Sequence, residues 1–597
     1  MKLKLDPEGY QPPKSGILLL QFLIGALFFV FVLRFWYLQI HKGTEFARQA
    51  QNNRLRNERV YASRGLIRDR NGILLAENRP AFGLALVRED CPDITTTLAQ
   101  VSVWMDTPLE QLITKFNQDK RKVKPFEPIL LFTDIPFEQV TKIESQLMHW
   151  PGLITVAHSK RYYPQSHEFA HILGYVAEAN EKELAMDKVL SLGDTIGKQG
   201  LEYILEPRLR GEKGEYSVEV DVLGRALGKV LVKAPQHGED IQLSLDAQLQ
   251  QKIVSLLDTH AACVIVIEPH TGRLQALVTT PAYDNNLFVR GLSQKNWEIL
   301  RDNPRHPLQN RTIQSTYPPA SIWKLLMIGL FLEEGIAPST HITCTGSVTL
   351  GDHIFRCWKK HGHGSVDMKH SLTDSCDVYF YILGEKLGID KIENFAKACG
   401  FGSLTKIDLP YEKIGLVPSR SWKRSRFGDN WYKGETLNTS IGQGYTLTTP
   451  LQIAVFVSSL INGGNLMKPL LLSEDKPQVL GKIPFSEETL AFINNTMRLT
   501  VEKGTARVLK RNDAIIGGKT GTAQVVKLKM VGERRLKADE VSYMERDHAW
   551  IASWGKKDDQ EFVVVVMIEH GGMGSSTAGP IARKVYDILF STKQEHS

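Results

Sequence analysis

Cysteine is scarce in this chain, with six among 597 residues, which is too few for the disulfide framework of small secreted domains. Internal repeats and low-complexity tracts are absent. A dense basic run is also missing, because the formal charge of +7 is spread along the chain; this argues against a nucleic-acid partner. Hydrophobic residues (42%) and charged residues (23%) are as common as in ordinary globular proteins, and the length predicts more than one domain.

One long apolar run stands near the N-terminus. Residues 15–33 are almost wholly apolar, and Trp36 and Tyr37 follow them. About twenty such residues span a bilayer, and aromatic side chains suit its interface. A cleaved signal peptide fits less well, because the run is too long and no small-x-small cleavage site follows. We predict an uncleaved single-pass anchor at residues 15–38, after a cytoplasmic arm at residues 1–14.

The charges that flank the anchor do not decide its orientation by the positive-inside rule. Three basic residues precede the apolar run and three follow it closely: Lys2, Lys4 and Lys14, then Arg34, Lys42 and Arg48. We expect the short arm inside and the bulk of the chain outside, since the chemistry argued below requires that side.

Residues 39–243 carry no paired carboxylates and no activated nucleophile. We expect a stalk helix from 41 to about 60, a hairpin at Asn71-Gly72, a small helical insert at 93–150, and strands from Asp221 to Leu243. The region therefore reads as an elongated non-catalytic pedestal.

A second domain is expected at residues 244–592. It opens with an amphipathic helix that Asp246 caps. Strands are predicted at 263–268, 273–278, 514–516, 549–554 and 562–568, and a closing helix at 580–590. Strands at both ends with helices between them indicate an α+β fold, with one antiparallel sheet covered by helices.

Three short strings carry the chemistry. Ser321 and Lys324 lie three residues apart on an expected helix, so they share one face and are close enough to hydrogen-bond. S-x-x-K alone is weak, because it also occurs at Ser403, Ser473 and Ser553. Only Ser321 is followed in order by Ser375-Cys376-Asp377 and Lys519-Thr520-Gly521. This order is the signature of penicillin-recognising serine enzymes.

The set closely resembles the penicillin-binding transpeptidases, and the resemblance covers residues 15–590. The upstream strings resemble the pedestal, or dimerisation-type domain, of class B members: Arg64-Gly65, Asp69-Arg70-Asn71-Gly72, Arg161 to Pro164, and Gly200-Leu201-Glu202. The anchor and the string from Phe355 to Gly364 narrow the resemblance to the elongation-type penicillin-binding protein 2.

The resemblance implies a role for each matched residue. Ser321 would attack the D-Ala-D-Ala carbonyl of a peptidoglycan stem peptide, Lys324 would take its proton, and Ser375 would relay a proton to the leaving D-alanine. The remaining roles concern the substrate: backbone N–H groups of Ser321 and Thr522 would form the oxyanion hole, and Lys519 and Thr520 of the Lys519-Thr520-Gly521 string would hold the substrate carboxylate.

Asp377 departs from the commonest pattern, which has Asn at the third position of the second string. An ionised carboxylate cannot donate a hydrogen bond, but it can accept from Lys324 and favours the charged form of that lysine. The alternative is a cap on the helix that follows Asp377, and both roles are compatible.

Three cysteines and one histidine gather around the second string: Cys344, Cys357, His363 and Cys376. Three thiolates and an imidazole complete a tetrahedral ligand set for one structural zinc ion, and the resemblance implies zinc at this place. A disulfide with one spare thiol is the alternative. Nearby substitutes for a misassigned ligand are His361, His353 and Asp352. The other cysteines (Cys91, Cys263, Cys399) are expected to be small buried hydrophobes.

The resemblance implies a function and a location. The expected enzyme is a serine-type D,D-transpeptidase of cell elongation and rod shape. It would be inhibited by β-lactams and held in the bacterial inner membrane with its catalytic domain in the periplasm. A membrane glycan polymerase of the SEDS family is the implied partner. The alternatives are a D,D-carboxypeptidase or β-lactamase-like hydrolase, and a β-lactam receptor or scaffold that activates a polymerase.

Overall fold

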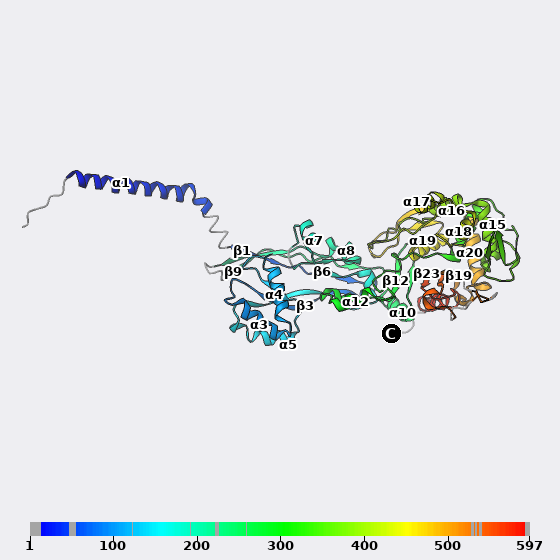
Figure 1. Ribbon diagram of the computed structural model, residues 1–597, viewed down its shortest axis with the longest axis horizontal. Helices are drawn as coiled ribbons and strands as arrows, with labels where there is room; N and C mark the ends of the chain where they lie inside the picture. Colours follow the sequence, from blue (N-terminus) through cyan, green and yellow to red (C-terminus); the bar gives the residue numbers. More distant parts are fainter. Residues whose placement is uncertain are drawn as a thin grey trace, which may run out of the picture. The chain divides into compact units, whose positions relative to one another are not determined.

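The computed structural model describes residues 14–46, 55–121, 123–190, 193–220, 226–257, 259–526, 530–531, 534–535 and 540–591 (Figure 1). The chain divides into two units. The first comprises Met1–Ala62 and Glu212–His237, and the second comprises Ser63–Gly211 and Gly238–Ser597.

Helix α1 (Lys14–Trp36) of the first unit continues into a π-helical turn at Tyr37–His41. The continuous apolar helix Ser15–His41 has 27 residues, and its most apolar stretch has a mean hydropathy of 2.7. None of that stretch is buried inside the protein, so its length and composition suit a bilayer. The expectation of one apolar N-terminal helix is confirmed.

The remainder of the first unit is an antiparallel sheet in the order β1-β8-β9, formed by β1 (Leu55–Val60), β8 (Gly214–Val220) and β9 (Ala226–Lys233). The expected stalk helix is therefore wrong at 55–60, and its residues 47–54 lie outside the described part. The reason is long-range pairing: Val60 pairs with Gly214 and Leu55 with Glu219, which no local pattern encodes.

The pedestal part of the second unit is built on a sheet in the order β10-β2-β3-β4, with β5 also paired to β3. Its strands are β2 (Ile67–Arg68), β3 (Leu74–Leu86), β4 (Ile129–Phe132), β5 (Leu153–Tyr162) and β10 (Ile241–Gln242). The expected hairpin at Asn71-Gly72 joins β2 to β3, and Gly72 has φ +86°. The buried Asp69 fixes this turn by accepting from the N–H groups of Asn71 (2.9 Å) and Ile73 (2.7 Å).

The insert at 93–150 is helical, as expected, except for β4. It contains α3 (Ile94–Trp104), α4 (Leu109–Asp119) and α5 (Phe137–Glu144) around a small core of its own. Shorter elements complete the pedestal: α6 (Ala170–Leu173), β6 (Val176–Glu178), α7 (Glu181–Met186), β7 (Thr195–Gly197), α8 (Gly200–Ile204) and α9 (Glu206–Leu209).

One buried ion-pair network joins three of the pedestal strings. The Glu202 side chain is fully buried and accepts from Arg161 Nε (2.7 Å) and Arg64 Nε (2.5 Å). Tyr163 Oη also donates to it, at 3.2 Å. Burial disfavours the Glu202 carboxylate, but the two arginines outweigh burial and lower its pKa. Strings that lie far apart in sequence therefore form one structural unit.

The region expected to be catalytic, residues 244–592, is called the catalytic region below. It is built on a five-stranded antiparallel sheet in the order β12-β11-β23-β22-β19. These strands are β11 (Ala262–Ile267), β12 (Leu274–Thr280), β19 (Ile515–Ala523), β22 (His548–Lys557) and β23 (Gln560–Ile568). They match the expected strands and confirm the α+β architecture.

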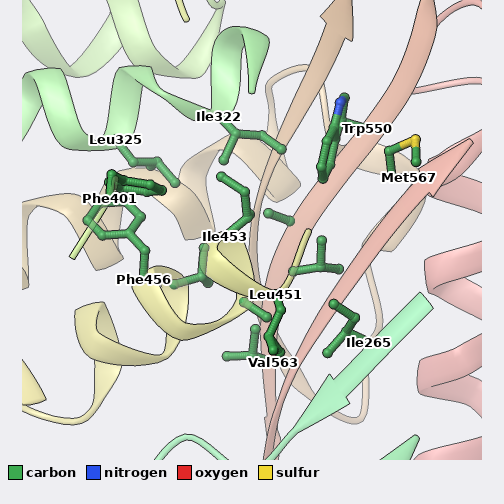
Figure 2. Packing of buried hydrophobic residues seen from close by; sticks show 14 of the residues in the cluster. Ile265, Ile322, Leu325, Phe401, Leu451, Ile453, Phe456, Trp550, Val563 and Met567 are labelled. Carbon is green, nitrogen blue, oxygen red and sulfur yellow. The ribbon is translucent and has the colours of Figure 1, made fainter. Parts of the chain in front are cut away.

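Helices cover both faces of this sheet. Successive side chains along a strand point to opposite faces, and here both sets are buried. Val264 and Val566 face the layer of α10 (Ala247–Leu257) and α21 (Ala578–Leu589). Ile265 and Val563 face the opposite layer, which contains α13 (Lys324–Glu333) and α19 (Pro450–Ile461). Figure 2 shows Ile322, Leu451 and Ile453 packed toward Val563, Ile265 and Trp550 of the sheet.

The helices and short strands that remain form the rest of the catalytic region. The helices are α11 (Asn286–Val289), α12 (Gln294–Arg301), α14 (Met368–Thr373), α15 (Asp377–Leu387), α16 (Ile389–Ala398), α17 (Arg420–Phe427), α18 (Lys433–Ser440) and α20 (Glu487–Glu502). The short strands are β13 (Ile342–Cys344), β14 (Ser347–Leu350), β15 (His353–Arg356), β16 (Gly364–Val366), β17 (Asn465–Met467), β18 (Val479–Lys482), β20 (Met530–Val531) and β21 (Arg534–Arg535).

Candidate active site

Ser321 lies in a tight turn rather than in a regular helix. Residues Ala320–Ile322 form one 3₁₀ turn, and α13 begins only at Lys324. Ala320 has φ +50°, a left-handed conformation that a residue with a Cβ seldom adopts. Its N–H donates to Gly442 O at 2.9 Å, and a Cβ on Gly442 would lie 2.4 Å from Ala320 O. The neighbouring backbone thus fixes the turn that carries the half-buried Ser321.

Lys324 is fully buried beside the second string. Its Nζ donates to Asp377 Oδ1 at 2.6 Å, to Ser375 O at 3.0 Å and to Ser375 Oγ at 3.3 Å. Among the described residues, no hydrogen bond joins Lys324 Nζ to Ser321 Oγ. The expected hydrogen bond between nucleophile and base is therefore not formed in this structure. Such contacts commonly tighten only when substrate binds.

Lys519 reaches the same hydroxyl from the sheet. Its Nζ donates to Ser375 Oγ at 2.8 Å and to Thr520 O at 3.1 Å. Burial and the neighbouring Lys324 lower the pKa of Lys519 well below its ordinary value, although Asp377 opposes the shift. Ser375, itself in a left-handed conformation with φ +56°, therefore lies between two amines and is placed to pass protons.

The strand with Lys519, Thr520 and Gly521 is the edge strand β19, packed against the Ser321 turn. A Cβ on Gly521 would lie 3.3 Å from Pro319 O, so glycine allows this close approach. Thr520 Oγ1 donates to Thr505 Oγ1 at 2.9 Å. Thr522 O accepts from Gln443 Nε2 at 3.1 Å, which holds the end of the strand over the turn.

Asp377 accepts from Lys324, as expected, but it does not cap its own helix. It is the first residue of α15, and the capping position belongs to Cys376, which makes no side-chain cap. The second oxygen, Oδ2, accepts from the backbone N–H of Trp358 at 3.0 Å. One carboxylate therefore links Lys324 to Trp358, the residue that follows Cys357.

The sulfur and nitrogen atoms of Cys344, Cys357, His363 and Cys376 all lie within 4.8 Å of one another. His363 Nδ1 is 3.7 Å from Cys344 Sγ and 3.5 Å from Cys357 Sγ. Tetrahedral zinc with ordinary bond lengths requires a sulfur–nitrogen separation of about 3.6 Å. These two sulfur–nitrogen separations are of the size that a tetrahedral zinc site requires.

Other features of this cluster agree with a closed metal site. All six cysteines are free thiols. The contact between Cys357 and Cys376 lowers the pKa of the Cys357 thiol and raises the pKa of the Cys376 thiol, so the two titrate as a pair. Gly346 and Gly362 bring the two ligand loops together, since a Cβ on either would lie within 2.2 Å of a carbonyl oxygen. His361, His353 and Asp352 are outside the cluster, and Cys91, Cys263 and Cys399 are buried as expected.

The other S-x-x-K serines lie outside this constellation. Ser553 is buried in β22 and donates to Val564 O, Ser473 donates to Leu243 O, and Ser403 is exposed on a loop. Sequence reasoning missed the backbone N–H of Trp358 and the amide of Gln443. Gln443 had one signal in the sequence, namely the glycines on both sides of it, Gly442 and Gly444. In the structure both glycines have positive φ.

Two family models match the chain over most of its length. The penicillin-binding protein dimerisation domain matches residues 59–243, and the penicillin-binding protein transpeptidase domain matches residues 262–587. The peptidoglycan D,D-transpeptidase MrdA of Acinetobacter baumannii is 35% identical over 95% of this chain and 86% of its own length. The chain belongs to the penicillin-binding protein 2 family.

Solved structures of penicillin-binding protein 2 are also similar to this chain. The complex of penicillin-binding protein 2 (PBP2) with MreC from Helicobacter pylori matches with a TM-score of 0.79 and 29% identity, over 90% of this chain and 99% of its own. A structure on the coordination of polymerization and crosslinking by a peptidoglycan synthase complex matches with a TM-score of 0.70 and 29% identity, over 98% of this chain and all of its own. The expected family resemblance is confirmed.

Proposed function

We propose that this protein is a peptidoglycan D,D-transpeptidase that cross-links stem peptides through an acyl-enzyme on Ser321. The observation that carries the proposal is the convergence of Lys324 and Lys519 on one hydroxyl, Ser375 Oγ, beside the turn that holds Ser321. The named relative is a D,D-transpeptidase, and this chain covers most of its length.

In the first half-reaction, Ser321 Oγ attacks the carbonyl carbon between the two terminal D-alanines. Lys324 receives the hydroxyl proton, an ester bond forms, and the peptide C–N bond breaks. The leaving amine of D-alanine takes up a proton through Ser375, which the buried amines contact. In the second half-reaction, the amine of another stem peptide attacks the ester, and the proton it loses returns to Ser321.

Backbone and charge assist both steps. The N–H groups of Ser321 and Thr522 stabilise the tetrahedral oxyanion, and such donors contribute a few kcal/mol each. Lys519 and Thr520 hold the terminal carboxylate of the stem peptide, because an amine and a hydroxyl at the edge strand suit that anion.

The cysteine and histidine cluster is proposed to hold one structural zinc ion. Three sulfurs and one nitrogen would leave no open position for water, so zinc supplies only stability here. The chain's own residues do the positioning: Cys376 immediately follows Ser375, and the residue after Cys357 donates its N–H to Asp377. The bound loop therefore sets the second catalytic string.

Zinc content tests this part. One zinc per chain is expected in wild-type protein and in Cys399→Ser, which removes a buried cysteine outside the cluster. Cys357→Ser should lose the metal. Equal zinc in all three proteins, or none in the wild type, contradicts the site.

The anchor is proposed to hold the short arm in the cytoplasm and the catalytic region in the periplasm, since stem peptides are cross-linked there. A membrane glycan polymerase is the proposed partner; the matching peptidoglycan synthase complex couples polymerization with crosslinking. Protease added outside spheroplasts should cut the catalytic region and leave an N-terminal tag intact, and the opposite pattern contradicts the orientation.

Fluorescent penicillin tests the catalytic assignment. Wild-type protein should acquire one stable label, and Ser321→Ala should acquire none. Ser403→Ala is the matched control, because it alters an exposed S-x-x-K serine and should label normally. Labelling of Ser321→Ala would exclude the nucleophile, and rapid loss of label from the wild type would indicate a β-lactamase instead.

A further inference from the structure

A cavity of about 160 Å³ lies between the pedestal part and the catalytic part of the second unit. Residues of and near α6 and α8 form one wall, and α11, α12 and residues 308–314 form the other. Its volume accommodates a single six-membered ring with its substituents. Boundaries between domains are common places for ligand sites.

Aromatic rings dominate the lining. Tyr175 and Phe288 stack with 4.0 Å between ring centroids, and Tyr283 stands edge-on to Phe288 at 5.3 Å. Trp297 contributes a fourth ring; it is 37% exposed, and none of the described aromatic rings pairs with it. The apolar face of a flat ring packs well on such a surface.

Uncommitted polar groups face the same space. Gln314 Oε1 accepts from Asn310 N at 3.2 Å, but its amide nitrogen has no partner among the described residues. Within the same ranges, the half-buried side chains of Gln199 and Tyr175 make no hydrogen bond. These half-buried side chains can both donate and accept hydrogen bonds, which suits a ligand rich in hydroxyl and amide groups.

The cavity is electrically neutral. None of the described residues that line it is Asp, Glu, Lys or Arg. Burial and the neighbouring Arg311 lower the pKa of His171 to about 3, so its ring is uncharged at neutral pH. A carboxylate or phosphate would find no counter-charge here, which excludes the acidic stem peptide as the occupant.

Hydrogen bonds across the boundary hold the walls in place. Asn310 Nδ2 donates to His171 O at 3.4 Å, Tyr283 Oη donates to Ala170 O at 3.2 Å, and Asn285 Nδ2 donates to Gly174 O at 2.8 Å. A site whose walls are fixed in this way is largely preformed, which reduces the entropy lost on binding.

We propose that this cavity binds one N-acetylated sugar ring of a glycan strand, at a site distinct from the catalytic serine. The inference rests on the proposed function, because the stem peptides of a peptidoglycan substrate are attached to a glycan strand. Gln314 is part of the wall, and the chain runs from it directly to Ser321, seven residues later. A ring held here keeps the strand on the enzyme while its stem peptides are exchanged at Ser321.

Binding is tested on full-length protein in detergent, first acylated with benzylpenicillin so that the catalytic cleft is filled. The probe is an oligomer of N-acetylglucosamine, whose rings carry no charge, observed by saturation-transfer NMR and titrated by fluorescence. Trp297→Ala should weaken binding roughly two- to tenfold, because one aromatic contact is lost. Tyr203→Ala, at a half-exposed residue of α8 outside the cavity, should bind like the wild type.

The outcomes separate this inference from the proposed function. Acylated protein that does not bind the glycan, or equal binding by the Trp297→Ala and Tyr203→Ala variants, overturns the sugar site and leaves the transpeptidase intact. Protein that binds the glycan but is not acylated by benzylpenicillin supports the sugar site and contradicts the proposed function.

Discussion

Replacing Asp377 by Asn tests the link between the lysine and the cysteine loop. The carboxylate accepts two hydrogen bonds, from the Lys324 ammonium through Oδ1 and from the Trp358 N–H through Oδ2. An amide of the same shape has one acceptor oxygen and one donor nitrogen. In the Asp377→Asn protein, either Lys324 or Trp358 must therefore lose its acceptor.

The burial of the site sets the size of the effect. The Lys324 side chain is fully buried and that of Asp377 is 12% exposed, so water cannot easily replace the lost acceptor. A buried donor left without a partner costs about 1–3 kcal/mol, and more where the donor is charged.

Two measurements test this expected loss. The guanidinium midpoint reported by the buried tryptophans of the catalytic region should fall. Acylation by fluorescent penicillin should also slow, because Lys324 loses the acceptor that holds it beside Ser375. Asp374→Asn is the control, because it removes a neighbouring carboxylate that does not bond to Lys324. An Asp377→Asn protein with wild-type stability and an unchanged acylation rate would refute the linkage.

Three further substitutions have defined outcomes. Lys519→Met should remove one source of pH dependence of the folding stability. The folded-state pKa of Lys519 is lowered, so the stability of the wild type rises with pH between that pKa and the unfolded value of about 10.5. Denaturant unfolding at several pH values should therefore show a flatter profile in the variant. Gly442→Ala should slow penicillin acylation at least tenfold, because its Cβ would meet Ala320 O; an unchanged rate would show that the turn is tolerant. Glu202→Gln should destabilise the pedestal by about 3–5 kcal/mol, since it leaves the buried Arg161 without a carboxylate partner, while Arg64 keeps Glu206. Glu239→Gln, at an exposed ion pair, should leave the thermal unfolding of the pedestal unchanged.

Local patterns were sufficient for the elements with strong periodicity or explicit signals. The apolar anchor, the Asn71-Gly72 turn and the strands of the catalytic sheet all follow from residue spacing and composition. The order of the Ser321, Ser375 and Lys519 strings predicted that they meet, and the structure brings Lys519 and Lys324 to the same Ser375 hydroxyl.

What the sequence could not supply was geometry that depends on distant partners. β1 exists because it pairs with β8, more than 150 residues away. The left-handed Ala320, which delays the start of α13, depends on Gly442. The second hydrogen bond of Asp377 depends on a backbone N–H, and backbone groups carry no sequence signature. Each of these features is a tertiary contact overriding or completing a local preference.

Asp69 has a mechanical consequence. Besides holding the hairpin turn, its second oxygen accepts from the N–H of Ala247, the first residue of α10, at 3.0 Å. One buried carboxylate thus clamps the pedestal hairpin and the opening helix of the catalytic region to the same point. A force applied to the hairpin is transmitted to α10, and through its packing on β12 to the catalytic sheet. A displacement of the hairpin therefore acts on the start of α10 through the single side chain of Asp69.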